Sequence, residues 1–208
     1  MVLIDYGAGN IKSIQNMLKK IGVASIISND IEDIKRADKL ILPGVGHFDY
    51  GMKKLRSAGL IEVLNQKVKE DKCPILGICL GAQLLGDSSE EGSEQGLGWI
   101  SMDIVKFDKS RMADKLKIPH MGWNRLSKVV NSKQQKGELF EGLGEDARFY
   151  FVHSYHMKPK NEDYVLGKTV YGYQFVSAVQ YENIYGVQFH PEKSHIYGMK
   201  LLRNFSNL

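Results

Sequence analysis

The chain has 208 residues, of which 28 are basic and 24 acidic, and 43% of them are hydrophobic. This composition excludes a disordered, collagen-like or low-complexity chain. A chain of this length buries roughly 70% of the surface that its unfolded form exposes, so we expect one globular domain over residues 1–208. Its two cysteines, Cys73 and Cys79, do not suggest a secreted disulfide scaffold. We therefore expect a protein of the reducing cytoplasm.

Charge and hydropathy argue against two classes of partner. No apolar run approaches the ~20 residues that span a bilayer, and Asp5 stands where a signal peptide carries its basic region. The net charge of +4 comes mainly from scattered lysines rather than from one basic block. Such lysines usually keep a helix face solvated. We expect neither a membrane nor a nucleic acid as partner.

The first half of the chain alternates short apolar runs with helical patterns, which is typical of βαβ units and a parallel sheet. A helix is predicted from Ile11 to Ile21, with Asn10 as its cap and Gly22 at its stop. A second helical pattern runs from Met52 to Asp71. Strands are predicted at 2–5, 25–28, 40–44 and 74–79. The last two are apolar at successive positions, which indicates burial on both faces.

From about residue 97 the pattern changes to strand-like segments separated by short polar or glycine-containing turns. This pattern favours a more antiparallel half. A closing helix is predicted over 196–205, and the stretches 108–117 and 131–138 are predicted as exposed loops. Together the elements predict one α/β domain with an open mixed sheet flanked by helices. The predicted strands of this half are 99–107, 148–155, 164–171, 174–181 and 184–189.

Cys79 lies in the sequence GICLG, at the junction of an apolar strand and a helix. This is the cysteine form of a nucleophile elbow, in which a sharp turn raises the side chain above the sheet edge and the glycines make room for the backbone. The start of the following helix favours the thiolate, because its N–H groups and partial positive charge stabilise an anion. The alternative is a buried structural cysteine, which is how we interpret Cys73.

Near the other end, His190 and Glu192 are two residues apart in VQFHPEKS. In an extended chain, residues i and i+2 project from one face, and Pro191 restricts the backbone between them. A carboxylate beside an imidazole fixes its tautomer and stabilises the imidazolium. The three residues therefore form a candidate Cys/His/Glu arrangement, although His190 alone would be an ordinary polar residue at a strand end.

A glycine-rich turn, LPGVGHF at 42–48, follows the third predicted strand. Such a turn can direct backbone N–H groups at a developing oxyanion, beside the N–H of Leu80. Two other patterns are weaker. The sequence DYGAGN at 5–10 has Lys12 where a dinucleotide fingerprint needs its third glycine. His153 and His156 suggest zinc, but residues three apart in a strand point to opposite faces.

The segments PGVG, GICLGAQ and FHPEKS, in this order along the chain, resemble the class I (triad) glutamine amidotransferases. The wider set resembles the glutaminase subunit of imidazole glycerol phosphate synthase and spans nearly the whole chain. That set is DYGAGN, LPGVGHF, GICLGAQLL, SSEEG, GLGW, PHMGWN, YFVHSY and GVQFHPEKS. The resemblance implies a flavodoxin-like class I amidotransferase fold, a glutaminase activity that needs no cofactor or metal, and a heterodimer with a (β/α)₈ cyclase subunit that receives the ammonia.

Position by position, the resemblance implies a role for each matching residue. Cys79 would be the nucleophile, His190 the general base and acid, and Glu192 its orienting partner. The oxyanion region would be formed by Gly44, Val45, Gly46 and Leu80. The substrate L-glutamine would be held by Gln83, Glu91, Ser154 and Tyr155. The face that meets the partner subunit would carry His120, Trp123, Asn124 and Lys193.

Some positions depart from the family pattern. His47 stands where the family usually has a small residue, Ala82 replaces a methionine, and the ending SHIYGMKLLRNF is unfamiliar. A paralogue that feeds ammonia to another synthase, for example for surface-sugar amidination, therefore stays open. Two further alternatives are an elbow-cysteine peptidase or stress protein, where a histidine often follows the cysteine directly, and a non-catalytic binding module.

Overall fold

The computed structural model describes residues 1–129 and 138–208 of the chain. The loop predicted over 131–138 therefore lies outside the described residues, apart from its last position. Four strands of the first half pair in parallel in the order β2-β1-β3-β4. Their bounds are β1 (Val2–Ile4), β2 (Ile26–Ser28), β3 (Leu40–Leu42) and β4 (Ile75–Ile78). The predicted parallel half is thus present.

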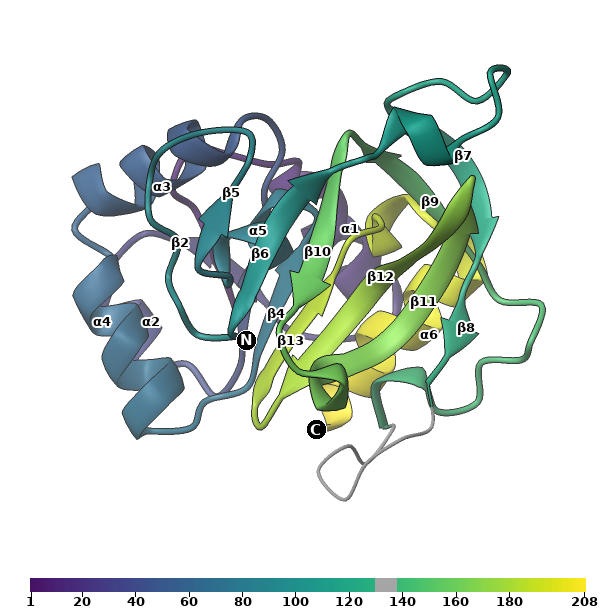
Figure 1. Cartoon of the computed structure of the whole chain (residues 1–208). Helices are drawn as coiled ribbons and strands as arrows, with labels where there is room; N and C mark the ends of the chain where they lie inside the picture. Colours follow the sequence, from purple (N-terminus) through teal and green to yellow (C-terminus); the bar gives the residue numbers. More distant parts are fainter. Residues whose placement is uncertain (130–137) are drawn as a thin grey trace.

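The second half extends this sheet with strands of both directions (Figure 1). β13 lies parallel to β4 and antiparallel to β12, which also pairs with β10 and β11. β6 pairs with β10, and the short β5 and β8 lie on β6 and β11. The bounds are β5 (Ser88–Ser89), β6 (Met102–Lys106), β8 (Ser127–Lys128), β10 (Tyr155–Pro159), β11 (Val165–Tyr171), β12 (Tyr173–Tyr181) and β13 (Ile184–Val187).

A separate antiparallel pair, β7 (His120–Arg125) and β9 (Arg148–His153), lies beside the main sheet. The segment 148–155 was predicted as one strand, but it divides at Ser154 into β9 and β10. The chain therefore leaves one ladder and enters another at this residue. That change of direction brings the β9–β10 junction to the carboxyl end of β4, as described below.

Helices cover both faces of the sheet. They are α1 (Ile11–Lys20), α2 (Ile31–Arg36), α3 (Phe48–Ser57), α4 (Ile61–Asn65) with its continuation η1 (Gln66–Glu70), α5 (Leu80–Leu84) and α6 (His195–Asn207). Short 3₁₀ turns are η2 (Lys109–Arg111), η3 (Glu138–Phe140), η4 (Glu162–Tyr164) and η5 (Pro191–Lys193). The helix predicted over 52–71 is interrupted, because α3 ends at Ser57 and Gly59 adopts a positive φ of 68°.

Two hydrophobic cores lie on opposite faces of the sheet. Alternation along β1 shows this directly, since Val2 and Ile4 belong to one core and Leu3 to the other. The first core is packed by helices α2 to α5 and the second by α1 and α6. Strands buried on both faces explain why β3 and β4 have apolar residues at successive positions. The predicted α/β fold, an open mixed sheet flanked by helices, is confirmed.

One local prediction is wrong, and one helix was not predicted. Asn10 makes no side-chain hydrogen bond to the start of α1, so it does not cap that helix. The short helix α2 was not predicted, although Asp30 caps it by accepting from the N–H groups of Glu32 and Asp33. Among the described residues, we find no helix with the length and apolar character needed to cross a membrane.

Candidate active site

Cys79 stands at the turn between β4 and α5, with φ 54° and ψ −111°. A residue with a side chain rarely adopts this conformation, and such strain is held only where the surroundings enforce it. The neighbouring glycines leave no space for a side chain. A Cβ at Gly81 would lie 1.8 Å from the carbonyl oxygen of Leu42, and one at Gly77 would lie 2.7 Å from Cα of Ala82. The backbone thus has the tight turn expected of a nucleophile elbow.

His190 reaches the same place from the adjacent strand. Val187 pairs with Ile78 where β13 and β4 lie parallel, and the N–H of Cys79 donates to the carbonyl of Val187 at 2.8 Å. The chain then continues past the sheet to His190, whose N–H donates to the carbonyl of Tyr150 at 2.9 Å. Cys79 and His190 consequently line one cavity, although they are far apart in sequence.

Glu192, in the turn η5, orients the His190 ring. Nδ1 of His190 lies 2.7 Å from Oε1 of Glu192, and the two side chains are only 1% and 2% exposed. A carboxylate oxygen can only accept, so Nδ1 carries the proton of this bond. The other ring nitrogen, Nε2, is then the one that can exchange a proton with the sulfur.

The charges around the imidazole favour its protonated form. Burial alone would lower the pKa of His190, but the Cys79 sulfur and the Glu192 carboxylate outweigh this effect and raise the pKa to about 10. The fully buried Gln188 lies close by, with Nε2 3.8 Å from Sγ of Cys79 as a donor. Both groups stabilise a thiolate. Gln188 was not predicted, although its spacing from His190 places both residues on one side of an extended chain.

The predicted oxyanion region follows β3. Val45, Gly46 and Leu80 line the cavity beside Cys79, and Val45 is 44% exposed. Gly44 does not line it, but its carbonyl accepts the N–H of Leu80 at 3.3 Å. The N–H expected to stabilise an oxyanion is therefore engaged by a neighbouring carbonyl in this state.

The cavity has a volume of about 360 Å³, and the four residues predicted to hold glutamine all line it. They are Gln83, Glu91, Ser154 and Tyr155. Gln83 donates through Nε2 to the carbonyl of Tyr155 at 3.2 Å and to Oε1 of Gln188 at 3.1 Å. Both of its N–H bonds are used, so its amide oxygen is the atom left to accept from a ligand. Pro119, Val152 and His153 complete the lining and were not predicted.

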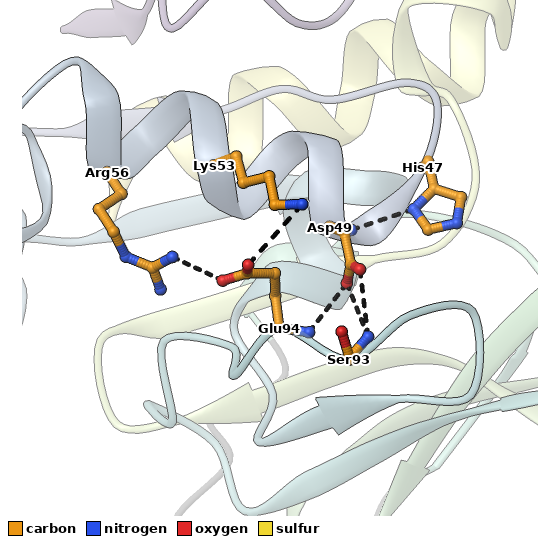
Figure 2. Close-up of polar contacts among 6 residues, drawn as sticks. All are labelled: His47, Asp49, Lys53, Arg56, Ser93 and Glu94. Atoms are coloured by element: carbon orange, nitrogen blue, oxygen red, sulfur yellow. Dashed lines mark hydrogen bonds and ion pairs between the residues drawn. The ribbon is translucent and has the colours of Figure 1, made fainter.

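The start of α3 holds one wall of this cavity. Figure 2 shows the Asp49 carboxylate facing the backbone N–H groups of Ser93 and Glu94, at 3.0 and 2.9 Å from Oδ1. These two bonds hold the pKa of Asp49 below its usual value, and the bond from Glu94 has the larger effect. Glu94 in turn forms ion pairs with Arg56 at 2.5 Å and with Lys53 at 3.9 Å. The segment carrying Ser93 and Glu94 is thereby tied to one helix.

A further bond ties this wall to the oxyanion turn. Oε2 of Glu91 accepts the N–H of Phe48, the first residue of α3, at 2.8 Å. His47 caps the same helix by accepting the N–H of Asp49 through Nδ1 at 3.2 Å. The departure from a small residue at position 47 thus provides a helix cap. Because Phe48 is the last residue of the glycine-rich turn, its bond to Glu91 fixes the position of Glu91 relative to that turn.

The four predicted interface residues lie on two faces of β7 and its surroundings. Trp123 is 46% exposed, stacks on His195 and makes an edge contact with Tyr150, over whose ring Lys193 places its Nζ at 5.6 Å. His120 is only 2% exposed and Asn124 is half-buried, since they alternate with Trp123 along the strand. The side chain of His120 therefore faces the interior.

Met121, which was not predicted, is 61% exposed on the same side of β7 as Trp123. Strand alternation was the signal that separates these two residues from His120 and Asn124. Among residues 1–129 and 138–208 no group of three or more potential metal ligands is found. His153 and His156 instead bond to the carbonyls of Tyr155 and Met157.

Known proteins share the sequence pattern and the fold of this chain. The family model described as Glutamine amidotransferase class-I matches residues 2–207. In solved structures, the fold resembles a crystal structure titled glutamine amidotransferase, with a TM-score of 0.73 at 20% identity, covering 100% of this chain and 99% of that one. It also resembles the glutaminase domain of Trypanosoma brucei CTPS with bound acivicin, with a TM-score of 0.64 at 16% identity over 99% and 93% of the two chains. The chain belongs to the class-I glutamine amidotransferases.

Curated relatives are similar over their whole length. A Pseudomonas aeruginosa protein named imidazole glycerol phosphate synthase subunit HisH 2 is 51% identical over 208 residues, 100% of this chain and 99% of its own length. A Methanococcus maripaludis protein of the same name is 53% identical over 205 residues, 99% of this chain and 98% of its own. The HisH subunit of Bdellovibrio bacteriovorus is 45% identical over 99% and 98% of the two chains.

Proposed function

We propose that this chain is the glutaminase subunit of an imidazole glycerol phosphate synthase. It hydrolyses glutamine to glutamate and ammonia, and the ammonia passes to a cyclase subunit that makes imidazole glycerol phosphate for histidine biosynthesis. The observation that carries the proposal is a buried His190–Glu192 pair, joined at 2.7 Å, that shares a cavity with the strained Cys79. Full-length relatives named HisH at 45–53% identity support the choice of acceptor.

The first half-reaction needs a sulfur anion and a proton donor. The Cys79 thiolate attacks the side-chain carboxamide carbon of glutamine, and negative charge develops on the amide oxygen. Backbone N–H groups of the glycine turn and of Leu80 stabilise that oxyanion, that of Leu80 once it no longer donates to the carbonyl of Gly44. Protonated His190 then gives its Nε2 proton to the departing nitrogen, so ammonia leaves and a glutamyl thioester remains on Cys79.

The second half-reaction returns the site to its starting state. Neutral His190 takes a proton from a water molecule, and the hydroxide attacks the thioester carbonyl. The C–S bond breaks, glutamate leaves, and the thiolate and the imidazolium are restored. Glu192 remains ionised throughout and stabilises the imidazolium.

The carbonyl of Gly44 affects how fast the chain hydrolyses glutamine without its partner. It accepts the N–H of Leu80 at 3.3 Å, so an oxyanion has to compete with it for that donor. Removing one oxyanion-hole donor typically costs roughly 10² to 10³ in rate. We therefore expect little glutamine hydrolysis by the isolated chain and a large increase when the partner is bound.

The partner is a cyclase of the (β/α)₈ type, with which this chain forms a heterodimer in the cytoplasm. Its contact surface on this chain is the exposed group of Met121, Trp123 and Lys193, near the cavity wall formed by Pro119 and Val152. A closed passage between the subunits serves the chemistry, because ammonia in neutral water is protonated and is then no longer a nucleophile. Aromatic residues such as Trp123 commonly dominate the binding energy of such interfaces.

The test uses the two-subunit enzyme with the Cys79→Ala variant. We expect this variant to lose glutamine-dependent synthesis and to keep synthesis from added ammonium salts, because only the nucleophile is removed. The matched control is Cys73→Ala, which changes a buried cysteine outside the cavity and is expected to keep both activities. Equal loss of both activities in Cys79→Ala would contradict the assignment. A wild-type complex that hydrolyses glutamine without making imidazole glycerol phosphate would point to another acceptor.

A further inference from the structure

Two buried histidines beside the cavity take no part in the reaction described above. His120 on β7 and His153 on β9 are paired in register, with Nδ1 of His120 3.0 Å from Nε2 of His153. Nδ1 of His153 lies 2.7 Å from the carbonyl oxygen of Tyr155, and Nε2 of His120 lies 3.3 Å from Nδ2 of Asn124. These four residues form a continuous hydrogen-bonded chain.

The direction of every bond in this chain is determined by its two ends. The Tyr155 carbonyl can only accept, so Nδ1 of His153 carries a proton and the Nε2 of a neutral ring accepts. Nδ1 of His120 must then donate, which leaves its Nε2 to accept from the amide of Asn124. Burial lowers the pKa of both histidines, that of His120 to about 4, so each ring is neutral at pH 7 and carries one proton.

The Asn124 end is anchored by the backbone. Its Nδ2 also donates to the carbonyl of Val170 at 2.8 Å, and its Oδ1 accepts the N–H of Arg125 at 2.8 Å. If the Asn124 amide were reversed, its oxygen would face the carbonyl oxygen of Val170 and its NH₂ group would face the N–H of Arg125. Neither pair can form a hydrogen bond. The ring of His120 is also confined, since it stacks on Phe151 and Tyr171 at centroid distances of 4.7 and 4.0 Å.

The other end of the chain reaches the nucleophile. The Tyr155 carbonyl accepts a second bond, from Gln83, which bonds to Gln188, which in turn donates to Sγ of Cys79. Tyr155, Gln83 and Cys79 of this series line the glutamine cavity, and so does His153. On the opposite side of β7, Met121 and Trp123 are exposed. The strand β7 therefore carries an exposed apolar face and, on its other side, Asn124 and His120, the first two residues of the hydrogen-bonded chain.

We propose that Asn124, His120 and His153 are positioning residues for glutamine. They hold the Ser154–Tyr155 wall at the distance that the substrate requires, and they connect the exposed face of β7 to that wall. A partner that binds Met121 and Trp123 and shifts β7 would move the wall through fixed bonds. This role rests on the proposed glutaminase function and adds to it a route by which binding of the partner acts on the substrate site.

The test compares two substitutions of the same kind. His120→Phe removes both ring nitrogens and keeps the aromatic stack, so it breaks the chain at its centre. His156→Phe is the matched control, because His156 is also buried and packs on the same Phe107 but bonds to Met157 and Tyr173 instead. We expect His120→Phe to raise the KM for glutamine by roughly five- to tenfold in the two-subunit enzyme, the fold-change that loss of about one hydrogen bond produces. The kcat should change less than the KM, and His156→Phe should leave the KM within about twofold.

A second variant guards against misfolding of the first. Asn124→Asp has the same shape and is half-buried, but it presents an acceptor where His120 needs a donor. It should raise the KM in the same way. If both variants leave the KM within about twofold of wild type, or if His156→Phe raises it as much as His120→Phe, the positioning role is refuted.

A spectroscopic readout is independent of turnover. Long-range ¹H–¹⁵N correlation spectra of the wild-type chain at pH 7 should show His120 and His153 as neutral rings protonated at Nδ1. A proton on Nε2 of either ring, or an imidazolium, would refute the stated directions of the hydrogen bonds, even if the enzyme is active. If the wild-type complex fails to hydrolyse glutamine while the tautomers are as stated, the proposed function has failed and the chain of bonds stands.

Discussion

The charge of Glu192 can be removed with little change in shape. Oε1 of this carboxylate accepts from His190, while Oε2 is buried and has no hydrogen-bond partner among the described residues. In Glu192→Gln the new NH₂ group can occupy the place of Oε2, and the oxygen can still accept from Nδ1 at about the same distance. The substitution therefore exchanges a charge-assisted hydrogen bond for a neutral one.

The size of the effect follows from that exchange. Hydrogen bonds to a charged group contribute about 1.5–3 kcal/mol and neutral ones about 0.5–1.5 kcal/mol, so the imidazolium loses on the order of 1.4 kcal/mol. That loss corresponds to a pKa of His190 about one unit lower in the variant than in wild type. His190, whose pKa is raised to about 10, holds its proton below that pH and loses it as the pH rises through about 10.

The assay is the pH profile of kcat/KM for glutamine in the two-subunit enzyme. Because protonated His190 is the acid that releases ammonia, activity should fall on the alkaline side as this proton is lost. In Glu192→Gln the alkaline limb should move about one pH unit lower, so kcat/KM should fall about tenfold above pH 10 and change little at pH 8, where His190 is mostly protonated in both proteins. Glu182→Gln, which breaks only an exposed ion pair with Lys72, is the control. An alkaline limb at an unchanged pH with kcat/KM within twofold of wild type would refute the reasoning.

Three further outcomes are expected. A glutamine-like diazo-ketone should label Cys79 and spare Cys73, whose pKa is raised by burial, and mass-spectrometric detection of label on Cys73 alone would reverse the choice of nucleophile. Trp123→Ala should weaken binding of the cyclase subunit by at least about tenfold in a titration, whereas Ile26→Ala, at the β2 edge of the sheet, should not; equal affinities would remove Trp123 from the interface. The free energy of unfolding should fall between pH 7 and pH 5, because unfolded histidine binds a proton near pH 6.5 while folded His120 does so only near 4. His120 alone contributes on the order of 2 kcal/mol to this fall at pH 5, and urea midpoints that agree at the two pH values would contradict it.

Much of the fold could be predicted from local pattern. The apolar runs at Leu40–Leu42 and Ile75–Ile78 are strands buried on both faces, and the glycines beside Cys79 do mark a tight turn. The unpredicted helix α2 shows a different limit. Its cap, Asp30, was visible in the sequence, but six residues with a single buried position carry almost no periodic signal.

Most residues that line the cavity could be predicted, but the hydrogen bonds between them could not. Asp49 meets the N–H groups of Ser93 and Glu94, and these contacts depend on how α3 and the 91–94 segment pack together. The N–H of Leu80 was expected to be available, yet the carbonyl of Gly44 accepts it. Backbone hydrogen bonds between distant segments leave no trace in residue identity, because every residue except proline carries the same groups.

The residues Val187 and Ile78, which pair between β13 and β4, have a consequence for how such a protein can diversify. Cys79 and His190 lie just beyond the carboxyl ends of two neighbouring parallel strands, so the spacing of the sheet, about 4.8 Å between strands, sets where the two segments leave it. Insertions or exchanges in the surrounding loops can then remodel what docks outside while the bond-breaking pair keeps its geometry. Evolution can therefore change the molecule that accepts the ammonia without altering the residues that release it.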